Sequence, residues 1–534
     1  MAGEVKQYHP IIQPILDAFA TKADEPAHFA DQPKIQVDQV VSHLAFVYEK
    51  LRNVIDFKEE TLIRKNAVER ILKRRVGLGG TAKNITLPLI KELIRGGYLD
   101  NNTVPEFKIA EVNEIIDKYI KLANLIYQKK SAIQQKDVFQ WLFGMAAVEI
   151  DRKLVYQGID EALMLAMETV VKESVVFDRI KLSDEDRDLQ FFLAIRRVFV
   201  RSDESMINFD LWSRSFPEWK NPTDQLFDEF AAHIDEIYRR FEAEKNHPLG
   251  ERLRILMRRY SVLFRMLKDV ISEEPAVAAD ILKNPEILEE KIREACDERY
   301  TSTRKRLRRT AVRAILYVFL TKMLVAILLE VPIDFFLLRN FHMMPLVVNT
   351  LFHPFLMFLI VLAIRTPSDE NTDRVVSGLK VVVYDGGKTN APNRVKGVLT
   401  QGSISSFVFR LFYGLTFILS FGLIIFALVK LQFSIPSMIL FLLFLSIVTF
   451  FGIKLRQTAT ELVVLKRREN IVTLLLDVFS IPLLRVGHWI AQKAPKVNVF
   501  IFVFDVIFEA PFKAFIEILE DWISFLREKK ENIY

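Results

Sequence analysis

Three ionisable residues lie in or beside an apolar stretch of the chain: Lys322, Glu330 and Asp334. Lys322 interrupts the apolar run 314–329, and Glu330 follows on the same helix face about 12 Å away. Charge inside a membrane is costly and often marks a functional site. These residues could therefore form a cation or proton site between helices. In the structural alternative, Lys322 pairs with an acidic group on another span or lines a bundle interior, while Glu330 and Asp334 lie among lipid headgroups.

Other side chains with potential chemistry form no motif. His342 and His353 are eleven residues apart without carboxylates at ligand spacing, so we predict no metal site. The single cysteine, Cys296, excludes a Cys-based zinc site and a disulfide framework. The chain has no Ser-His-Asp set, no metalloprotease His-Glu-x-x-His motif and no dinucleotide-binding glycine fingerprint. We predict no cofactor, and the sequence leaves enzyme activity uncertain, with a non-enzymatic role favoured.

The elements that must position Lys322 and Glu330 are membrane-spanning helices. A bilayer core needs about 20 helical residues. Four runs with little or no charge come close to or reach this length: residues 313–329, 343–364, 411–429 and 431–453. We therefore predict an integral membrane protein with a transmembrane region over residues 301–455.

A dense basic cluster precedes the first of these runs. It consists of Arg304, Lys305, Arg306, Arg308, Arg309 and Arg313. Because the cluster adjoins the bilayer, we expect it to contact lipid headgroups on the cytoplasmic side, and we expect no nucleic acid partner. The net charge of +6 owes much to this cluster.

The positive-inside rule gives one orientation for all four spans. Basic residues also follow the second and fourth spans, whereas the opposite hairpins carry only Arg339 and Lys430. We therefore expect both termini in the cytoplasm. Residues 1–10 contain no apolar core, so we predict no cleavable signal peptide.

The region before the spans is charged and helical. Residues 1–36 contain several prolines with little periodicity, which predicts an irregular arm. Residues 37–300 form the predicted cytoplasmic helical domain, because apolar residues recur there at three- and four-residue spacing. Basic residues 73–75 are followed by several glycines. The spacing of these glycines fits a helix–loop–helix with solvated basic residues better than a phosphate-binding loop or a DNA-binding helix-turn-helix.

Two further segments carry predictions. The loop 365–403 is expected to be an exposed connector, with a short strand and turn over residues 381–387. The tail 456–534 is expected to form cytoplasmic-side helices. Its first helix, 471–491, places Asp477, Arg485 and His488 on one polar side, which favours a helix lying in the membrane interface and kinked at Pro482.

A second tail helix, 511–529, is amphipathic with an acidic polar face. Acidic residues are not attracted to anionic lipid, so this helix is expected to pack on protein.

The predicted fold class is all-α: a multi-helix cytoplasmic domain, four transmembrane helices and an amphipathic helical tail. The leading functional hypothesis is a membrane-anchored scaffold or adaptor that binds the lipid bilayer and a cytoplasmic protein through 37–300 or 511–529. The alternative is a transporter or channel component, which requires a homo-oligomer because four spans are few. A weaker alternative is a lipid-modifying enzyme at the cytoplasmic face.

Overall fold

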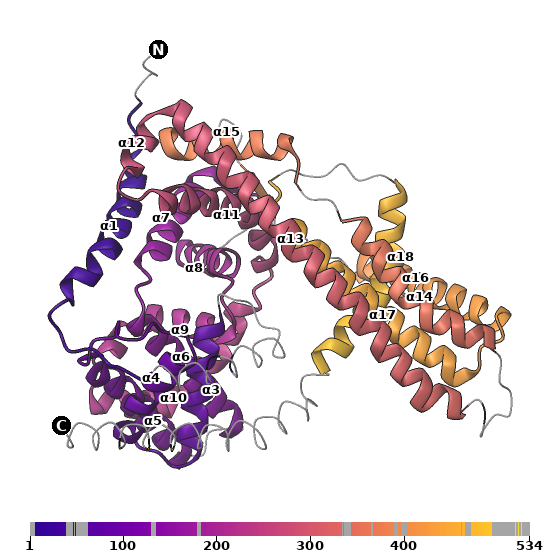
Figure 1. The fold of residues 1–534 in the computed structure, drawn as a ribbon, viewed down its shortest axis with the longest axis horizontal. Coiled ribbons are helices and arrows are strands. Elements are labelled where there is room, and N and C mark those ends of the chain that lie inside the picture. The colour runs from indigo at the N-terminus through magenta and orange to yellow at the C-terminus, as the bar shows by residue number, and fades with distance from the viewer. Residues whose placement is uncertain are drawn as a thin grey trace. The chain divides into compact units, whose positions relative to one another are not determined.

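The computed structural model describes most of the chain between residues 6 and 493. The described residues are 6–38, 46, 49, 62–129, 135–178, 183–333, 335, 343–364, 367–388, 393–396, 403–460, 462–464, 471–493, 518, 522 and 525. Within them almost all regular structure is helical (Figure 1), which confirms the predicted all-α fold. Most of the predicted helix at residues 40–55, and the 511–529 helix apart from three positions, lie outside the described residues.

The chain divides into two compact units. The N-terminal unit comprises residues 1–285, 380–397 and 503–534, and the membrane unit comprises residues 286–379 and 398–502. The chain between the second and third spans thus returns to the N-terminal unit before it enters the membrane unit again.

Helices dominate the N-terminal unit. In chain order they are η1 (Pro10–Ile12), α1 (Gln13–His28), α3 (Ile63–Gly77), α4 (Ala82–Arg95), α5 (Lys108–Gln128), α6 (Gln135–Leu154), α7 (Gly158–Ser174), α8 (Asp184–Ile195), η3 (Arg196–Val200), α9 (Glu204–Ser215), η4 (Pro217–Lys220), α10 (Asp224–Lys245), α11 (Gly250–Glu273) and α12 (Ala278–Lys283). Several begin at a side-chain cap. Ser183, for example, accepts a hydrogen bond from the Asp186 N–H at 3.1 Å and so satisfies a donor at the start of α8.

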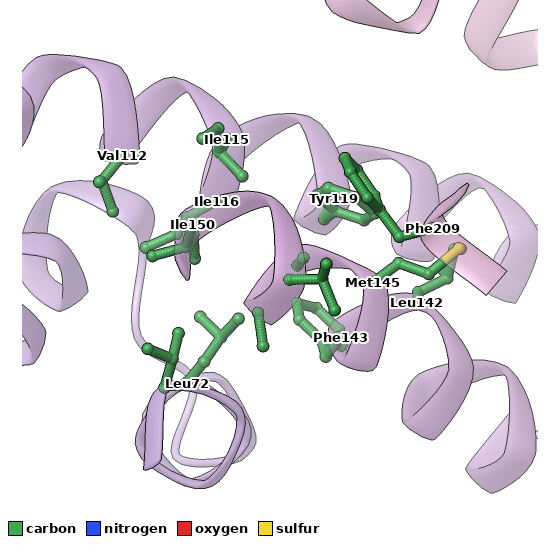
Figure 2. Close-up of a cluster of buried hydrophobic side chains, with 14 of the residues drawn as sticks. Leu72, Val112, Ile115, Ile116, Tyr119, Leu142, Phe143, Met145, Ile150 and Phe209 are labelled. Carbon is green, nitrogen blue, oxygen red and sulfur yellow. The ribbon is translucent and has the colours of Figure 1, made fainter. Parts of the chain in front are cut away.

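The main core of this unit lies between α3, α4, α5, α6, α9 and α10. One face of α5 carries Val112, Ile115, Ile116 and Tyr119, and Figure 2 shows these side chains beside residues of α6 such as Phe143. The three- and four-residue spacing of this face is the pattern that predicted a helix from the sequence. Full burial of each large apolar side chain stabilises the fold by roughly 1.5–3 kcal/mol.

The first helix differs from the prediction. The sequence predicted an irregular arm over residues 1–36, but residues 13–28 form α1, which packs against α7. Pro14 lies in the first turn of α1, where a missing N–H is tolerated, so this proline does not exclude a helix. Ile12, Ile15 and Phe19 are buried, and their burial stabilises a segment whose periodicity is too short to stand out.

The connector between the second and third spans also differs from the prediction. Residues Asp369–Asp385 form helix α15, so the strand predicted at 381–384 was wrong. A short apolar run such as Val381–Val383 fits a buried strand and a buried helix equally well. The predicted turn follows at Gly387, where φ is +82° and an added Cβ would lie 2.3 Å from Val170.

A small parallel sheet anchors this connector in the N-terminal unit. Strand β2 (Asn393–Lys396) pairs with β1 (Val175–Asp178), with Val175 opposite Asn393. The Asn393 side chain donates to the Tyr260 hydroxyl at 2.9 Å. The connector is therefore integrated into the unit instead of being wholly exposed.

In the described part of the membrane unit, several helical segments accompany the first part of α15. They are α13 (Pro285–Val325), η5 (Ala326–Glu330), α14 (Met343–Leu362), α16 (Ser403–Lys430), α17 (Ile435–Thr460) and α18 (Ile471–Lys493). Four helices in the described part of the chain are long and apolar enough to cross a membrane: 285–330, 343–362, 407–430 and 435–457. They coincide with the four predicted spans, so the prediction of a membrane protein stands.

Three of these helices meet in a small apolar contact. Val318 of α13, Met357 of α14 and Val448 of α17 form one buried cluster. Val318 lies one helical turn before Lys322, so this contact brings the lysine among the other helices of the membrane unit.

Candidate functional site

The two ionisable residues singled out in the sequence are enclosed by protein. Lys322 lies near the end of α13 with 0% of its surface exposed, and Glu330 ends the π-helical segment η5 with 1% exposed. No hydrogen bond or ion pair joins them within the described residues. Of the two interpretations that the sequence left open for Glu330, a site between helices fits this burial better than a place among lipid headgroups.

Helix α14 supplies the partner of Glu330. The Asn349 side-chain amide donates to the Glu330 Oε1 at 2.5 Å, and both residues are buried. A hydrogen bond to a carboxylate is among the stronger ones in proteins. Asn349 therefore fixes one oxygen of the carboxylate between α14 and η5.

His353 lies one turn after Asn349 on the same face of α14. Its Nδ1 is 3.0 Å from the Asn349 carbonyl oxygen, and its Nε2 is 3.0 Å from the Phe441 carbonyl oxygen of α17. A carbonyl oxygen can only accept. Both contacts are hydrogen bonds only when both ring nitrogens carry hydrogen, which is the protonated imidazole. A neutral His353 satisfies one carbonyl and leaves a lone pair facing the other.

The Phe444 ring of α17 lies close to both His353 and Lys322. The Lys322 Nζ lies 4.6 Å from the centroid of the Phe444 ring, in the range of a cation–π interaction. The centroid of the same ring is 5.9 Å from that of the His353 ring. Two cation-forming side chains thus flank one phenylalanine, with a single carboxylate, Glu330, connected to His353 through Asn349.

We call Lys322, Glu330, Asn349 and His353 the intramembrane polar cluster. Three of its atoms, the Lys322 Nζ, the Glu330 Oε2 and the Asn349 Oδ1, have no hydrogen-bond partner in the described part of the chain. Buried polar atoms are nearly always paired, because leaving one unpaired costs roughly 1–3 kcal/mol, and more when it is charged. The cluster can therefore exchange a proton or bind a small polar species without first breaking these atoms' hydrogen bonds.

Sequence analysis identified half of this cluster. Lys322 and Glu330 were predicted as one site, whereas Asn349 and His353 were missed as its partners. Their four-residue spacing on an uncharged span was the available signal, since it places both on one helix face. Asp334 and His342 lie outside the described residues.

The predicted juxtamembrane contacts lie on α13. Its six basic side chains, Arg304, Lys305, Arg306, Arg308, Arg309 and Arg313, are all exposed. Their exposure leaves them accessible to lipid headgroups, which stays a prediction.

The polar residues of α18 contact aromatic rings of the spans. The Arg485 guanidinium lies 5.2 Å from the Tyr413 ring centroid of α16, and the His488 ring lies 5.6 Å from the Phe450 ring of α17. Asp477 belongs to α18, but its side chain lies outside the described residues. No group of three or more His, Cys, Asp or Glu residues that could hold a metal ion is found in the described ranges.

Basic residues of the N-terminal unit are arranged quite differently. The basic side chains of α3 form ion pairs with acidic neighbours, so the predicted solvated basic face is not free in solvent. The pairs are Arg64–Asp151, Lys65–Glu69, Lys65–Asp203, Arg70–Glu49, Lys73–Glu69, Arg74–Glu92 and Arg75–Glu92. Charge on α3 is therefore matched locally.

The intramembrane polar cluster is therefore the arrangement that combines burial, ionisable groups and unsatisfied polar atoms at the depth of a membrane span. Comparison with protein-family models, with curated proteins and with solved structures found no match to this chain. The function is inferred from the residues and contacts of the protein itself.

Proposed function

We propose that the protein is a component of a membrane transport system in which the intramembrane polar cluster binds and releases protons. One observation carries this proposal: Lys322, Glu330 and His353 are enclosed together inside the membrane unit. Lys322 lies nine residues after Arg313, or about 14 Å along the helix, which is near the middle of a hydrocarbon core about 30 Å thick.

The energetic argument starts from the lysine. A lysine at the centre of a spanning helix costs about 2.5–3.5 kcal/mol on insertion scales. Among the described residues, Lys322 contacts the Phe444 ring but has no hydrogen-bond acceptor. Contacts in the folded protein therefore compensate little of this insertion free energy. A lysine at this depth whose Nζ has no hydrogen-bond partner in the described residues supports a role in moving protons or ions.

The chemical argument comes from His353. Taking up a proton adds a second N–H to a ring that already faces two carbonyl oxygens, at Asn349 and Phe441. Proton binding would therefore strengthen the connection between α14 and α17, and proton release would weaken it. Such a change couples protonation to helix packing. Since four spans are few to enclose a pathway, the proposal includes a homo-oligomer.

The test measures proton flux into proteoliposomes that contain the full-length protein and a trapped pH-sensitive dye. We expect Lys322→Met and Glu330→Gln to abolish the flux. Lys430→Met and Glu298→Gln are matched controls, because both residues are exposed and neither belongs to the cluster. Flux that is the same in all four variants as in the native protein would contradict the proposal.

A second candidate function, the membrane-anchored scaffold, is favoured by the form of α13. This helix runs for 41 residues, about 62 Å, so roughly half of it extends beyond the bilayer. Within the membrane unit α15 is tied to this extension, because Asn371 donates to the Tyr300 hydroxyl at 2.8 Å and Arg293 pairs with Asp373 at 2.8 Å. A braced helix of this kind suits a stalk that presents a surface to a cytoplasmic partner.

Cross-linking of the full-length protein in its native membrane, followed by purification, tests the scaffold. A specific cytoplasmic partner cross-linked to the residues before 300 would support it, and the absence of any such partner would remove its support. Among the described residues nothing favours the lipid-modifying enzyme.

The orientation is a further part of the proposal. We place both termini and the connector near Gly386 in the cytoplasm, because basic residues flank these ends of the spans. Accessibility tags at residues 1, 386 and 534 should report the cytoplasmic side, and tags at 340 and 432 the opposite side. If the tag at 340 is protected while that at 432 is labelled, the first hairpin does not cross the bilayer.

A further inference from the structure

Helix α18 contacts the middles of two spans. The Ser420 hydroxyl of α16 donates to the Phe479 carbonyl of α18 at 3.1 Å. At Gly487 an added Cβ would lie 2.2 Å from the Ser446 carbonyl oxygen of α17, so the two backbones touch there. Both serines are buried.

The positions of these serines give the depth of the contact. Ser420 lies nine residues after Leu411, where the apolar run of α16 begins, and Ser446 lies eight residues before Lys454. These separations are about 14 and 12 Å along a helix, close to half the thickness of a 30 Å hydrocarbon core. A helix that lies in the headgroup layer does not reach this depth.

The later part of α18 lies nearer the boundary. Arg485 is over the ring of Tyr413, which is two residues from Leu411, and His488 is beside Phe450, which is four residues from Lys454. These distances along the spans correspond to about 3 and 6 Å from the charged ends. Phe479 lies at the depth of Ser420, Gly487 contacts both Ser446 and Phe450, and His488 lies beside Phe450, so α18 passes from the middle of the spans toward the ends that we place in the cytoplasm.

We propose that α18 is a re-entrant membrane segment that packs on α16 and α17, with its outer apolar face in contact with the acyl chains of the cytoplasmic leaflet. On the outward side of α18 the apolar side chains of Phe479, Ile481 and Trp489 are 43%, 44% and 59% exposed, and the exposed Arg485 and His488 lie on the same side in its later part. Helix α16, which α18 contacts, also exposes apolar side chains such as Ile418, which is 69% exposed. This inference replaces the interfacial placement predicted for residues 471–491 and does not depend on the transport function.

Backbone chemistry agrees with a location in lipid. Pro482 lies inside α18 and has no N–H, so the Val478 carbonyl loses its normal helical partner. In a hydrocarbon environment freed backbone groups need donors from neighbouring helices, and serine side chains commonly supply them. Ser420 makes its hydrogen bond to the adjacent carbonyl, that of Phe479. Arg485 and His488 lie near the boundary, where long polar side chains reach water.

Quenching of tryptophan by brominated lipids tests the proposal with the full-length protein in bilayers. The bromines are placed either close to the headgroup or near the chain ends. Trp141, Trp212 and Trp219 are buried in the N-terminal unit, and a Trp489→Phe/Trp522→Phe variant gives their background signal. Ile481→Trp in that background reports the deep part of α18, and Trp489 in a Trp522→Phe variant reports the shallow part.

We expect the ratio of deep to shallow quenching to exceed one for Ile481→Trp and to fall below one for Trp489. Phe479→Trp serves as a second deep probe if Ile481→Trp does not fold. Equal preference for shallow bromines at both positions would mean an in-plane interfacial helix, and no quenching would mean a location outside the bilayer. A tag at Tyr534 should remain on the same side as a tag at residue 1, and a tag on the opposite side would show that α18 spans the membrane. Each of these three outcomes overturns the proposal.

Discussion

Two buried lysines, one in each unit of this protein, differ in whether their ammonium groups have acidic partners among the described residues. Lys65 of α3 is 3% exposed and Lys322 of α13 is 0% exposed. The Lys65 Nζ pairs with Glu69 at 2.8 Å and also with Asp203. The Lys322 Nζ faces the Phe444 ring and has no hydrogen-bond partner in the described part of the chain.

The pKa of Lys65 shows the consequence of this pairing. Burial alone lowers the pKa of Lys65, but the charges of Glu69 and Asp203 outweigh burial and raise it above the ordinary value of 10.5. The lysine is therefore firmly charged and structural. In the membrane unit the charge is not matched in this way, so burial by itself does not identify a site. The presence or absence of compensating groups separates a structural lysine from a functional one.

The largest effect is expected for Lys65→Met, which breaks the matched network. Asp203 and Glu69 would lose their shared cation, although Glu69 would keep Lys73, and removing one partner of a buried ion pair costs up to about 3–5 kcal/mol. Urea-induced unfolding of the full-length protein in mild detergent, followed by the fluorescence of the tryptophans in the N-terminal unit, measures this loss.

Lys172→Met is the matched control for Lys65→Met. Lys172 also pairs with two carboxylates, Glu168 and Asp188, but its side chain is 34% exposed. Exposed pairs contribute about 0–1 kcal/mol, so this variant should lose little stability. Equal losses in both variants would show that burial of the network at Lys65 does not matter.

A smaller loss is expected for Asn349→Leu in the membrane unit. This substitution removes the donor at 2.5 Å from the Glu330 Oε1 and leaves the carboxylate without it. An unsatisfied buried group costs about 1–3 kcal/mol, more when it is charged. Adding Glu330→Leu should restore most of the stability, because replacing both partners by apolar groups can be nearly neutral. Thermal unfolding in detergent measures both variants, and additive losses would disprove the pairing.

The elements of both units were predictable where the signal is local. A run of about 20 residues with little or no charge is visible from the sequence alone, and all four spans were found in this way. The pairing of β1 with β2 was not predictable, because it joins residues 175–178 to residues 393–396. Helix α1 was missed because prolines in an early turn resemble a break until the burial of Ile15 and Phe19 is known.

The candidate site was predictable only along one helix. Lys322 and Glu330 stand out because charge is rare in an apolar run. Asn349 and His353 carry no charge signal, and their approach to Glu330 and Phe441 depends on how α14 packs against η5 and α17. Helix packing in lipid depends on contacts that hydropathy does not encode. The same reason explains why the depth of α18 could not be read from its amphipathic pattern.

A pH titration tests the same ion-pair network through Glu69, the acidic partner of Lys65. Burial alone would raise the pKa of Glu69, but the charges of Lys65 and Lys73 outweigh it and hold that pKa below the ordinary 4.5. A carboxylate with a lowered pKa in the folded state stabilises the protein above its unfolded pKa, and this contribution is lost as the pH falls through the folded value.

The stability gap between the native protein and Glu69→Gln should therefore be constant at neutral pH and close as the pH falls below about 4.5. Urea titrations at a series of pH values measure the gap. In a Lys65→Met background the gap should be smaller, because Glu69 has lost its first partner. A gap that widens toward low pH would contradict the assigned sign.

The smallest effect on stability is expected for Lys322→Met, although its effect on function should be the most severe. No hydrogen bond is lost, since the Lys322 Nζ has none in the described residues, and methionine retains the apolar stem of the side chain. A buried charge is removed, which favours folding, while the cation–π contact with Phe444, worth about 0.5–2 kcal/mol, is lost. These terms oppose each other, so the thermal unfolding midpoint should stay the same or rise slightly. Lys65→Met measured in the same detergent provides the contrast. If Lys322→Met lowers the midpoint as much as Lys65→Met does, then Lys322 is a structural lysine like Lys65, and the case for a proton site in the membrane unit fails with it.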